Sequence, residues 1–265
     1  MTTYETLSNL PDTIGPMSIH GTDLSTISRQ FEIAAATVVA ASQAAGSAAA
    51  DADHSPALLE QAMRRLLELL ALVDKREGRT EDLTRQDVDI DELGDYAIHL
   101  LADLASAASA LQLVEESRQL EDLTLPMALW IAHHDGELRT LDPVVNALAR
   151  LANTLREPSQ LAQLYQTAAE LHRAVDHRMR LDPEKGKPVR PWRLLTMNQA
   201  IIATRSHQPA LIDEAYQVLI EALPEEAPHF FKEGMQQMEA LDYPQAVKQV
   251  VAKYYELWHT PRTLH

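Results

Sequence analysis

The most unusual local feature of the sequence is a run of basic side chains between Arg173 and Arg193. This stretch carries seven Lys or Arg residues against three acids, whereas the whole chain has a formal net charge of -16. Guanidinium groups bind phosphate and carboxylate groups bidentately, so the stretch could hold an anion or an acidic partner. Alternatively, it neutralises acidic neighbours in the fold or keeps a long loop soluble. The candidate anion- or partner-binding residues are Arg173, Arg178, Arg180, Lys185, Lys187, Arg190 and Arg193.

A second candidate for chemistry is the segment WIAHHDGEL, from Trp130 to Leu138. With a histidine upstream and an aspartate downstream, it gives the order His…His-Asp…Asp. This order resembles that of the HD-type metal-dependent phosphohydrolases, which are also all-helical. The resemblance implies a divalent ion that activates water for attack on phosphorus. The ligands that it implies are His99, His134, Asp135 and Asp176.

The same segment also has a purely structural interpretation. The His-Asp pair continues as Gly136-Glu137-Leu138, instead of the aliphatic-Gly-Lys that is more usual in that family. Histidines near the C-terminus of a helix interact favourably with its dipole. The segment can therefore be the polar end of a helix. In that case we expect that the chain binds no cofactor and is not an enzyme.

Composition places these candidates in an all-α protein. Hydrophobic residues make up 46% of the chain and Gly only 8 positions, while Ala, Leu, Glu and Gln recur throughout and favour helix. The chain has no cysteine, which excludes disulfides, thiolate catalysis and Cys-ligated zinc and suits a reducing compartment. Its N-terminal residues lack the pattern of a secretory signal, so a cytoplasmic protein is expected. The acidic charge argues against binding to nucleic acid or anionic lipid.

One uncharged stretch, from Ile33 to Ala50, is about as long as a membrane span. It consists mostly of Ala, which supplies little transfer free energy per residue. The stretch therefore predicts an Ala-rich helix that packs closely on a neighbour or is loosely ordered. A membrane anchor is the alternative, and membrane association is not expected.

Breaks in the helical pattern divide the chain into four predicted parts. Residues 1–30 are predicted to be a flexible arm, and residues 31–78 a small N-terminal helical part. Residues 79–95 are acidic and indicate a solvated linker, or else an acidic docking strip. Residues 96–265 are predicted to be a helical-repeat domain with a basic loop insertion near 176–191.

The prediction of repeats rests on the spacing of proline. Proline precedes apolar-periodic runs at Pro126, Pro158, Pro209 and Pro244, at intervals of 32, 51 and 35 residues. Because proline fits the first turn of a helix and stops the preceding one, each is predicted to begin the antiparallel partner of the helix before it. The basic insertion accounts for the long interval.

This spacing resembles the tetratricopeptide repeat (TPR), a helix-turn-helix unit of about 34 residues. The last unit, residues 227–260, carries the likeness best, because Gly234 and Ala246 fall where that family keeps small residues between its two helices. The resemblance implies a short solenoid of antiparallel hairpins that binds another protein. Two function classes follow: a non-enzymatic helical-repeat adaptor, or alternatively an HD-type phosphohydrolase-like domain.

The last helical run presents an aromatic face formed by Tyr254, Tyr255 and Trp258. A terminal repeat has no following unit to cover it, and Tyr and Trp are enriched at protein interfaces. The face therefore indicates a possible homodimer contact. The alternative is that these side chains pack inside the protein.

Overall fold

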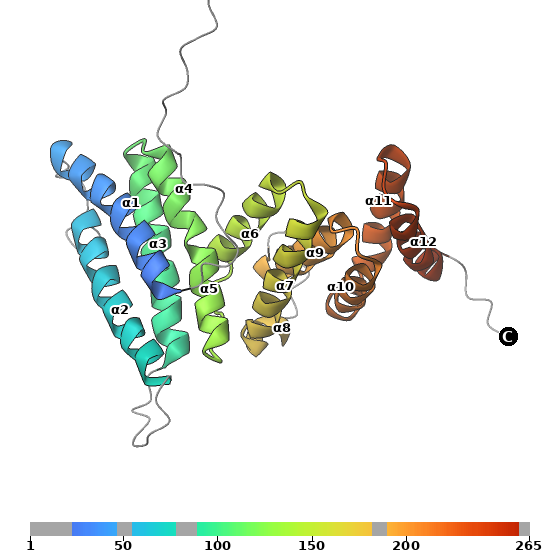
Figure 1. The fold of residues 1–265 in the computed structure, drawn as a ribbon, viewed down its shortest axis with the longest axis horizontal. Coiled ribbons are helices and arrows are strands. Elements are labelled where there is room, and N and C mark those ends of the chain that lie inside the picture. The colour runs from blue at the N-terminus through green and yellow to red at the C-terminus, as the bar shows by residue number, and fades with distance from the viewer. Residues whose placement is uncertain (1–22, 47–54, 78–88, 182–189, 260–265) are drawn as a thin grey trace, which may run out of the picture.

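Figure 1 shows a computed structural model of the chain, which describes residues 23–46, 55–77, 89–181 and 190–259. Helices occupy 84% of these residues and no strand occurs among them, so the all-α prediction is confirmed. The helices are α1 Leu24–Ala44, α2 Pro56–Glu77, α3 Ile90–Ala110, α4 Val114–Asp122, α5 Thr124–His133, α6 Asp142–Thr154, α7 Pro158–Ala174, α8 His177–Leu181, α9 Pro191–Arg205, α10 Pro209–Ala222, α11 Ala227–Ala240 and α12 Gln245–His259.

The first four helices pack together at the N-terminal end of the molecule (Figure 1). Helices α1 and α3 each pack against both α2 and α4. The inner side of α1 buries Ala34, Ala35 and Val38, so the described part of the Ala-rich stretch is a helix packed on its neighbours. Within the described ranges, no helix is both long enough and apolar enough to cross a membrane.

Two predicted boundaries are displaced in the structure. Helix α1 begins at Leu24, inside the predicted arm, and α3 begins at Ile90, inside the predicted linker. Asp89 caps α3, because its Oδ1 accepts a hydrogen bond from the amide of Glu92 at 3.0 Å. Residues 1–22 and 79–88 lie outside the described residues. Because α2 packs on α3, one hydrophobic core continues from α1 to α12.

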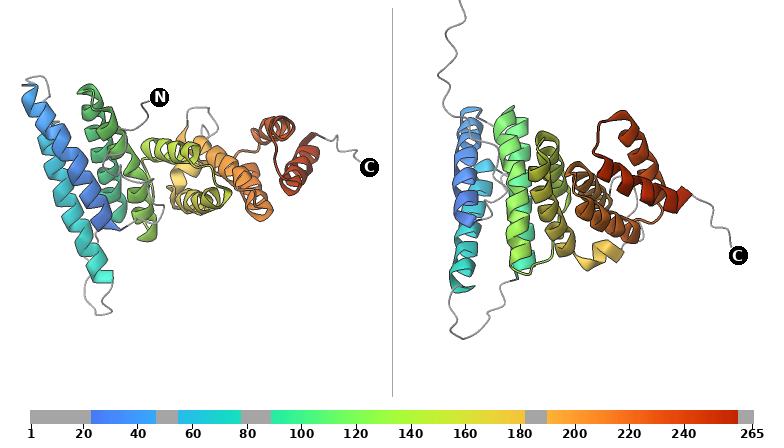
Figure 2. Two further views of the ribbon diagram at one scale, coloured as in Figure 1. Left: turned by 45° about the horizontal axis from the view of Figure 1, so that its top comes forward. Right: turned by 45° about the vertical axis from the view of Figure 1, so that its right-hand side comes forward.

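The remaining helices extend from the first four as an elongated row that ends with α11 and α12 (Figure 2). Contacts are mostly between elements close in the chain. Helix α5 packs on α3, α6 and α7; α9 packs on α7 and α10; α12 packs on α10 and α11. The short α8 lies within the predicted insertion, between α7 and α9.

Proline begins four of the helices. Pro56, Pro158, Pro191 and Pro209 are the first residues of α2, α7, α9 and α10, where a missing N–H leaves no helical hydrogen bond unmade. Pro244 directly precedes α12. The helix breaks predicted at Pro158, Pro209 and Pro244 are therefore present.

Pro126 differs, and the hairpin predicted there is wrong. Leu123, between α4 and α5, keeps right-handed helical angles (φ -67°, ψ -16°). Its amide donates to the carbonyl of Gln119, and its carbonyl accepts from the amide of Met127. Pro126 has no N–H for the carbonyl of Asp122, so the helix is interrupted and then resumes as α5 (Figure 1). No antiparallel partner begins at this proline.

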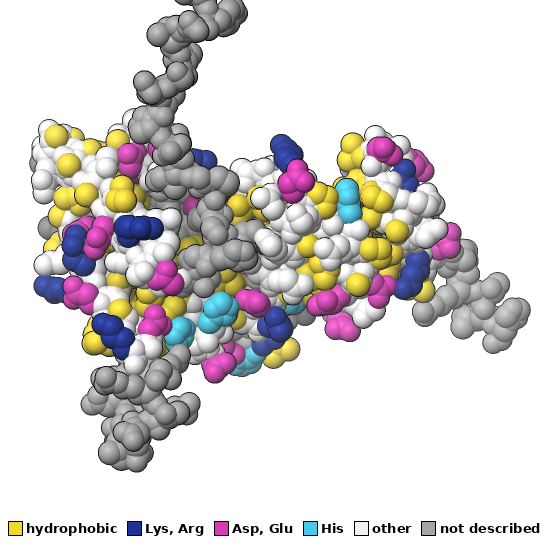
Figure 3. All heavy atoms as spheres, viewed as in Figure 1, with side chains coloured by type: hydrophobic (Ala, Val, Ile, Leu, Met, Phe, Trp, Pro, Cys, Tyr) yellow, Lys and Arg dark blue, Asp and Glu magenta, His cyan; other side chains and the backbone are white. Residues whose placement is uncertain are grey.

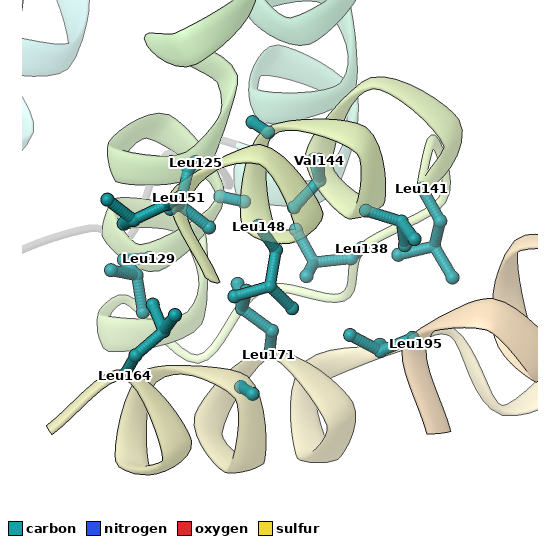
Figure 4. Close-up of a cluster of buried hydrophobic side chains, with 14 of the residues drawn as sticks. Leu125, Leu129, Leu138, Leu141, Val144, Leu148, Leu151, Leu164, Leu171 and Leu195 are labelled. Carbon is teal, nitrogen blue, oxygen red and sulfur yellow. The ribbon is translucent and has the colours of Figure 1, made fainter. Parts of the chain in front are cut away.

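Leucine side chains from α5, α6, α7 and α9 meet in the core beside the candidate site (Figure 4). Leu148 and Leu171 are fully buried at its centre. Leu138 and Leu141 reach the same core from the loop between α5 and α6, and each is 1% exposed. The loop is thus anchored by apolar side chains, which fixes its polar residues on the outside.

Candidate functional site

A two-bond backbone bridge holds the loop after α5 to the segment after α7. The amide of Leu138 donates to the carbonyl of Ala174 at 2.7 Å, and its carbonyl accepts from the amide of Asp176 at 3.0 Å. Leu138 pairs in parallel with Val175, and both side chains are buried. Their polar neighbours, Glu137 and Asp176, are thereby brought close together.

The end of α5 directs the loop toward this bridge. The amide of Gly136 donates to the carbonyl of Ile131 at 3.0 Å and that of Asp135 to Ala132 at 3.3 Å, which is the Schellman arrangement. Asp135 takes φ +58°, a left-handed conformation that Asp tolerates better than most residues. A Cβ on Gly136 would lie 2.8 Å from Cγ2 of both Ile131 and Ile90. Glycine therefore permits the close approach of the loop to α3.

The first turn of α3 supplies a second anchor for the loop. Asp91 Oδ1 accepts a hydrogen bond from the amide of Glu137 at 2.7 Å. Asp91 Oδ2 accepts another from Nη2 of Arg139 at 3.0 Å. The Asp91 carboxylate thus accepts hydrogen bonds from a backbone amide and from a guanidinium group. The first of these bonds holds the backbone of Glu137 in place.

Asp176 is the buried charge of the site, with 4% of its side chain exposed. Oδ1 accepts a hydrogen bond from the amide of Arg178 at 2.8 Å, and Oδ2 accepts one from Nη2 of Arg178 at 2.7 Å. Arg139 Nε lies 3.8 Å from Oδ2. The hydrogen bonds from Arg178 lower the pKa of Asp176 to about 2. The carboxylate is therefore ionised at neutral pH, and its charge is compensated as a buried charge must be.

Three side chains that could ligate a metal converge at this point: Glu137, Asp176 and His177. His177 Nδ1 lies 3.6 Å from Asp176 Oδ1 and 3.6 Å from Glu137 Oε2. One ligand atom from each residue lies within 4.8 Å of the other two, and among the described residues this is the one group of its kind. Figure 3 shows histidine, acidic and basic side chains gathered along the lower edge of the molecule, around α5 and α8.

Of the four ligands implied by the phosphohydrolase resemblance, this group contains Asp176 alone. His99 lies on α3, where Nδ1 is 2.9 Å from the carbonyl oxygen of Asp95 and Nε2 is 3.5 Å from Oγ1 of Thr140. Asp135 is the left-handed residue of the turn after α5.

His134 is held by the end of α2. Its Nε2 lies 2.9 Å from Oδ1 of Asp74, and its Nδ1 lies 2.7 Å from the carbonyl oxygen of Trp130. The imidazole also stacks on the Trp130 ring at 4.0 Å between centroids. Both ring nitrogens face protein oxygen atoms and 9% of the side chain is exposed, so His134 takes part in packing between helices.

The basic side chains of the predicted anion site that the structure describes have partners within the fold. Arg193 Nη2 donates to Oε2 of Glu226 at 2.9 Å, and Arg173 Nε donates to a carbonyl of its own helix. Arg178 is bonded to Asp176. These contacts fit the neutralising alternative better than an open anion site. Arg180 and Arg190 also have interaction partners, whereas Lys185 and Lys187 lie outside the described residues.

The aromatic face predicted on the last helix is turned largely toward the core. Tyr254 is 3% exposed, its hydroxyl donates to Oδ1 of Asp213 at 2.9 Å, and its ring stacks on Phe231. Tyr255 and Trp258 are partly buried against the same core. This arrangement favours the internal-packing alternative for Tyr254.

Sequence reasoning did not identify Glu137 and His177 as members of the site. Leu138 stands between Glu137 and Arg139, a pattern compatible with a short extended segment, whereas Val175 has a polar neighbour on one side only. Such a pattern does not predict which segment pairs with Leu138, because that segment lies far away in the chain. The structure supplies that pairing and, with it, the three convergent side chains.

No protein-family model matches the chain, and no curated protein or solved structure is significantly similar to it. Any function must therefore be inferred from its residues and their geometry.

Proposed function

We propose that the chain is a non-enzymatic helical-repeat scaffold for protein–protein interaction, built as a short TPR-like array. Helices α11 and α12 support the repeat interpretation, because they follow one another through a short connection and pack together. A Cβ on Gly234 would lie 3.3 Å from Cγ1 of Val251, so this small residue stands where the two helices touch. In such arrays each unit contacts its neighbours and leaves outer faces for partners.

The observation that carries the proposal is a set of exposed large apolar side chains on the first two helices. Ile33 on α1 is 58% exposed, and three leucines on α2 are about half exposed: Leu58 at 47%, Leu69 at 52% and Leu72 at 49%. We call these four side chains the N-terminal face. Large exposed apolar patches on water-soluble domains mark interaction sites, whereas single exposed apolar residues do not.

Both ends of the helical row carry exposed charged residues, and those of α1 and α2 include Arg29, Glu32, Arg64, Arg65 and Glu68. From Ile33 to Ala44, α1 has no charged residue, and its end in Figure 3 shows hydrophobic and neutral side chains. At the other end, Leu257 is exposed among charged neighbours. Solenoids shield their ends with polar caps, so the uncharged stretch of α1 suits a contact. The exposed charged residues of α11 and α12 include Lys232, Glu233, Glu239, Lys253 and Glu256.

We assign the N-terminal face to a second copy of the chain. Two copies that each carry a net charge of -16 repel one another, and the repulsion is small at α1 and α2, because their five acidic and five basic residues balance. Two helices of ~31 Å length and ~10 Å width present ~600 Å² per copy, or ~1,200 Å² in a two-fold dimer. That area lies within the range of specific interfaces. A closed two-fold pair is the commonest assembly of a soluble homo-oligomer, so it is the expected arrangement.

Sedimentation velocity of the full chain tests this assignment. We expect the wild type to be a dimer and the double variant Ile33→Glu/Leu69→Glu to be a folded monomer, because the change places four acids in the contact. Leu257→Glu, at an equally exposed position on α12, is the matched control and should remain dimeric. A monomeric wild type, or a dimer lost in the control and kept in the double variant, would refute the proposal.

The phosphohydrolase alternative would require His99, His134, Asp135 and Asp176 around one ion. His134 is bonded to Asp74 and stacked on Trp130, so the geometry favours the scaffold over the enzyme. A chain without cysteine is in keeping with a scaffold that acts in a reducing compartment such as the cytoplasm.

A further inference from the structure

We propose that Glu137, Asp176 and His177 bind a divalent transition-metal ion. Together they offer two carboxylate oxygens and one imidazole nitrogen, a donor set that suits Zn²⁺, Mn²⁺ or Ni²⁺. The residues belong to two segments that the backbone bridge between Leu138 and Val175 holds side by side. Because the core anchors this bridge, the ligands are largely pre-positioned before an ion arrives.

The distances between the ligand atoms are those of atoms around a common centre. His177 Nδ1 lies 3.6 Å from an oxygen of each carboxylate, from Asp176 Oδ1 and from Glu137 Oε2. Hydrogen bonds between nitrogen and oxygen are shorter, at ~2.7–3.2 Å. Atoms that bind one ion at ~2.1 Å with tetrahedral geometry lie ~3.4 Å apart. The imidazole therefore stands at coordination spacing from both carboxylates and is hydrogen-bonded to neither.

Asp176 is fixed in the manner of a metal-binding carboxylate. It is buried, and Arg178 holds it through its backbone amide at 2.8 Å from Oδ1 and through Nη2 at 2.7 Å from Oδ2. Hydrogen bonds of this kind orient the ligands of metal sites. The contacts of Arg178 Nε are longer, 3.2 Å to Oδ1 and 3.1 Å to Oδ2. The Arg178 side chain is 70% exposed, so Nε can withdraw when an ion approaches Oδ1.

The donor atoms of the site favour a transition metal over Mg²⁺ or Ca²⁺, and its net charge attracts a cation. Three carboxylates, those of Asp91, Glu137 and Asp176, face two guanidinium groups, those of Arg139 and Arg178. One negative charge is left to attract a cation, and a neutral imidazole adds a ligand without adding charge. Ca²⁺ takes six to eight oxygen ligands and Mg²⁺ demands an octahedral set rich in oxygen, whereas nitrogen donors suit Zn²⁺ and Ni²⁺.

A metal-free arrangement of the same atoms is the competing interpretation. In it, a protonated His177 bridges Glu137 and Asp176 electrostatically. That network needs no ion, so the protein should then bind none of the added metal. Metal titration consequently separates the two interpretations.

Isothermal titration calorimetry of the full chain, freed of metal with a chelator, is the decisive experiment. We expect one Zn²⁺ or Mn²⁺ ion per wild-type chain and at least ~10-fold weaker binding in both His177→Ala and Glu137→Gln. Both side chains are partly exposed, so the variants should fold. His133→Ala is the control, because His133 is a similarly exposed histidine that pairs with Glu170 at 3.0 Å outside the group.

Thermal melts provide the second readout. Added Zn²⁺ should raise the melting temperature of the wild type and of His133→Ala, and leave that of His177→Ala unchanged. No binding by the wild type, or binding of equal strength in all three variants, would overturn the site. The monomeric variant Ile33→Glu/Leu69→Glu should still bind the ion, so failure of the dimer and failure of the metal site are distinguishable.

Discussion

His134, the residue that caps the C-terminus of α5, contacts Asp74 near the end of α2, with 2.9 Å between Nε2 and Oδ1. The same carboxylate oxygen accepts a hydrogen bond from Nε1 of Trp130 at 2.9 Å. One acidic side chain therefore joins the second helix of the row to a stacked pair of aromatic rings on the fifth. Trp130 is 2% exposed, so its indole N–H depends on this partner.

Replacement of Asp74 should therefore weaken the fold. We expect Asp74→Ala to lower the free energy of unfolding by ~1–3 kcal/mol, because it leaves a buried indole N–H unpaired. Urea denaturation followed by Trp fluorescence measures the effect. Gln61→Ala, at an exposed position of the same helix, should change stability by less than ~0.5 kcal/mol. Equal effects in the two variants would show that Asp74 has no structural role.

Two glycines in helices should respond to alanine in opposite directions. A Cβ on Gly94 would lie 2.5 Å from Cδ1 of buried Ile131, so Gly94→Ala should cost ~1–3 kcal/mol through overpacking. At Gly234 the nearest atom is 3.3 Å away, and the gain in helix propensity, ~0.5–1 kcal/mol, should leave that variant as stable as the wild type or more so. Calorimetric melting temperatures measure both. A Gly94→Ala protein as stable as the wild type would contradict the tight contact between α3 and α5.

Stability should depend on pH through His172. Burial, with a smaller contribution from Arg180, lowers the pKa of His172 from 6.5 to about 4. Between these values the unfolded chain binds a proton that the folded chain does not, so stability falls as pH falls through this window. The loss attributable to His172 should reach about 3 kcal/mol near pH 4.

Denaturation curves at a series of pH values between 7 and 4 measure this loss. The variant His172→Gln cannot titrate and should show a shallower decline than the wild type. Parallel curves for the two proteins would show that His172 is protonated equally easily in both states.

Substitutions of Tyr254 should lower the free energy of unfolding and leave the oligomeric state unchanged. Tyr254 is 3% exposed and stacks on Phe231, so Tyr254→Ala should lower the free energy of unfolding by ~3–5 kcal/mol. Tyr254→Phe loses only the hydroxyl contacts with Asp213 and should cost ~0.5–1.5 kcal/mol. Sedimentation should show the same oligomeric state for Tyr254→Phe as for the wild type. If Tyr254→Ala were as stable as the wild type but changed the oligomeric state, Tyr254 would belong to an interface between copies of the chain.

The elements of the fold could be predicted where local chemistry decides them. Prolines at the first helical position and apolar spacing of 3.6 residues specify where α2, α7 and α10 begin. Pro126 shows the limit of that rule, since a proline in the first turn can follow either a loop or another helix. Leu123, which precedes Pro126, keeps helical backbone angles. Packing, rather than the local sequence, decides whether a loop or a helix comes before this proline.

The candidate site could be predicted only in part. Asp176 was identified through a pattern of His and Asp residues, but its actual neighbours, Glu137 and His177, were not. Glu137 and His177 lie close together because the backbones of two segments that are distant in the chain pair with each other. The residue types in the two segments do not predict this pairing. The resemblance implied His134 as a metal ligand, with the end of a helix as the alternative. Its contact with Asp74 depends on how α2 lies beside α5, which the sequence does not show.

The bridge between Leu138 and Val175 closes a loop of chain that contains the whole of α6 and α7. The bridge ties the two ends of this loop together, and its two side chains are buried in the same core as α6 and α7. The two helices and the bridge should consequently open as one cooperative unit in native-state hydrogen exchange. The amides of Leu138 and Asp176, which lie outside any helix, should then exchange as slowly as those in the middle of α6 and α7.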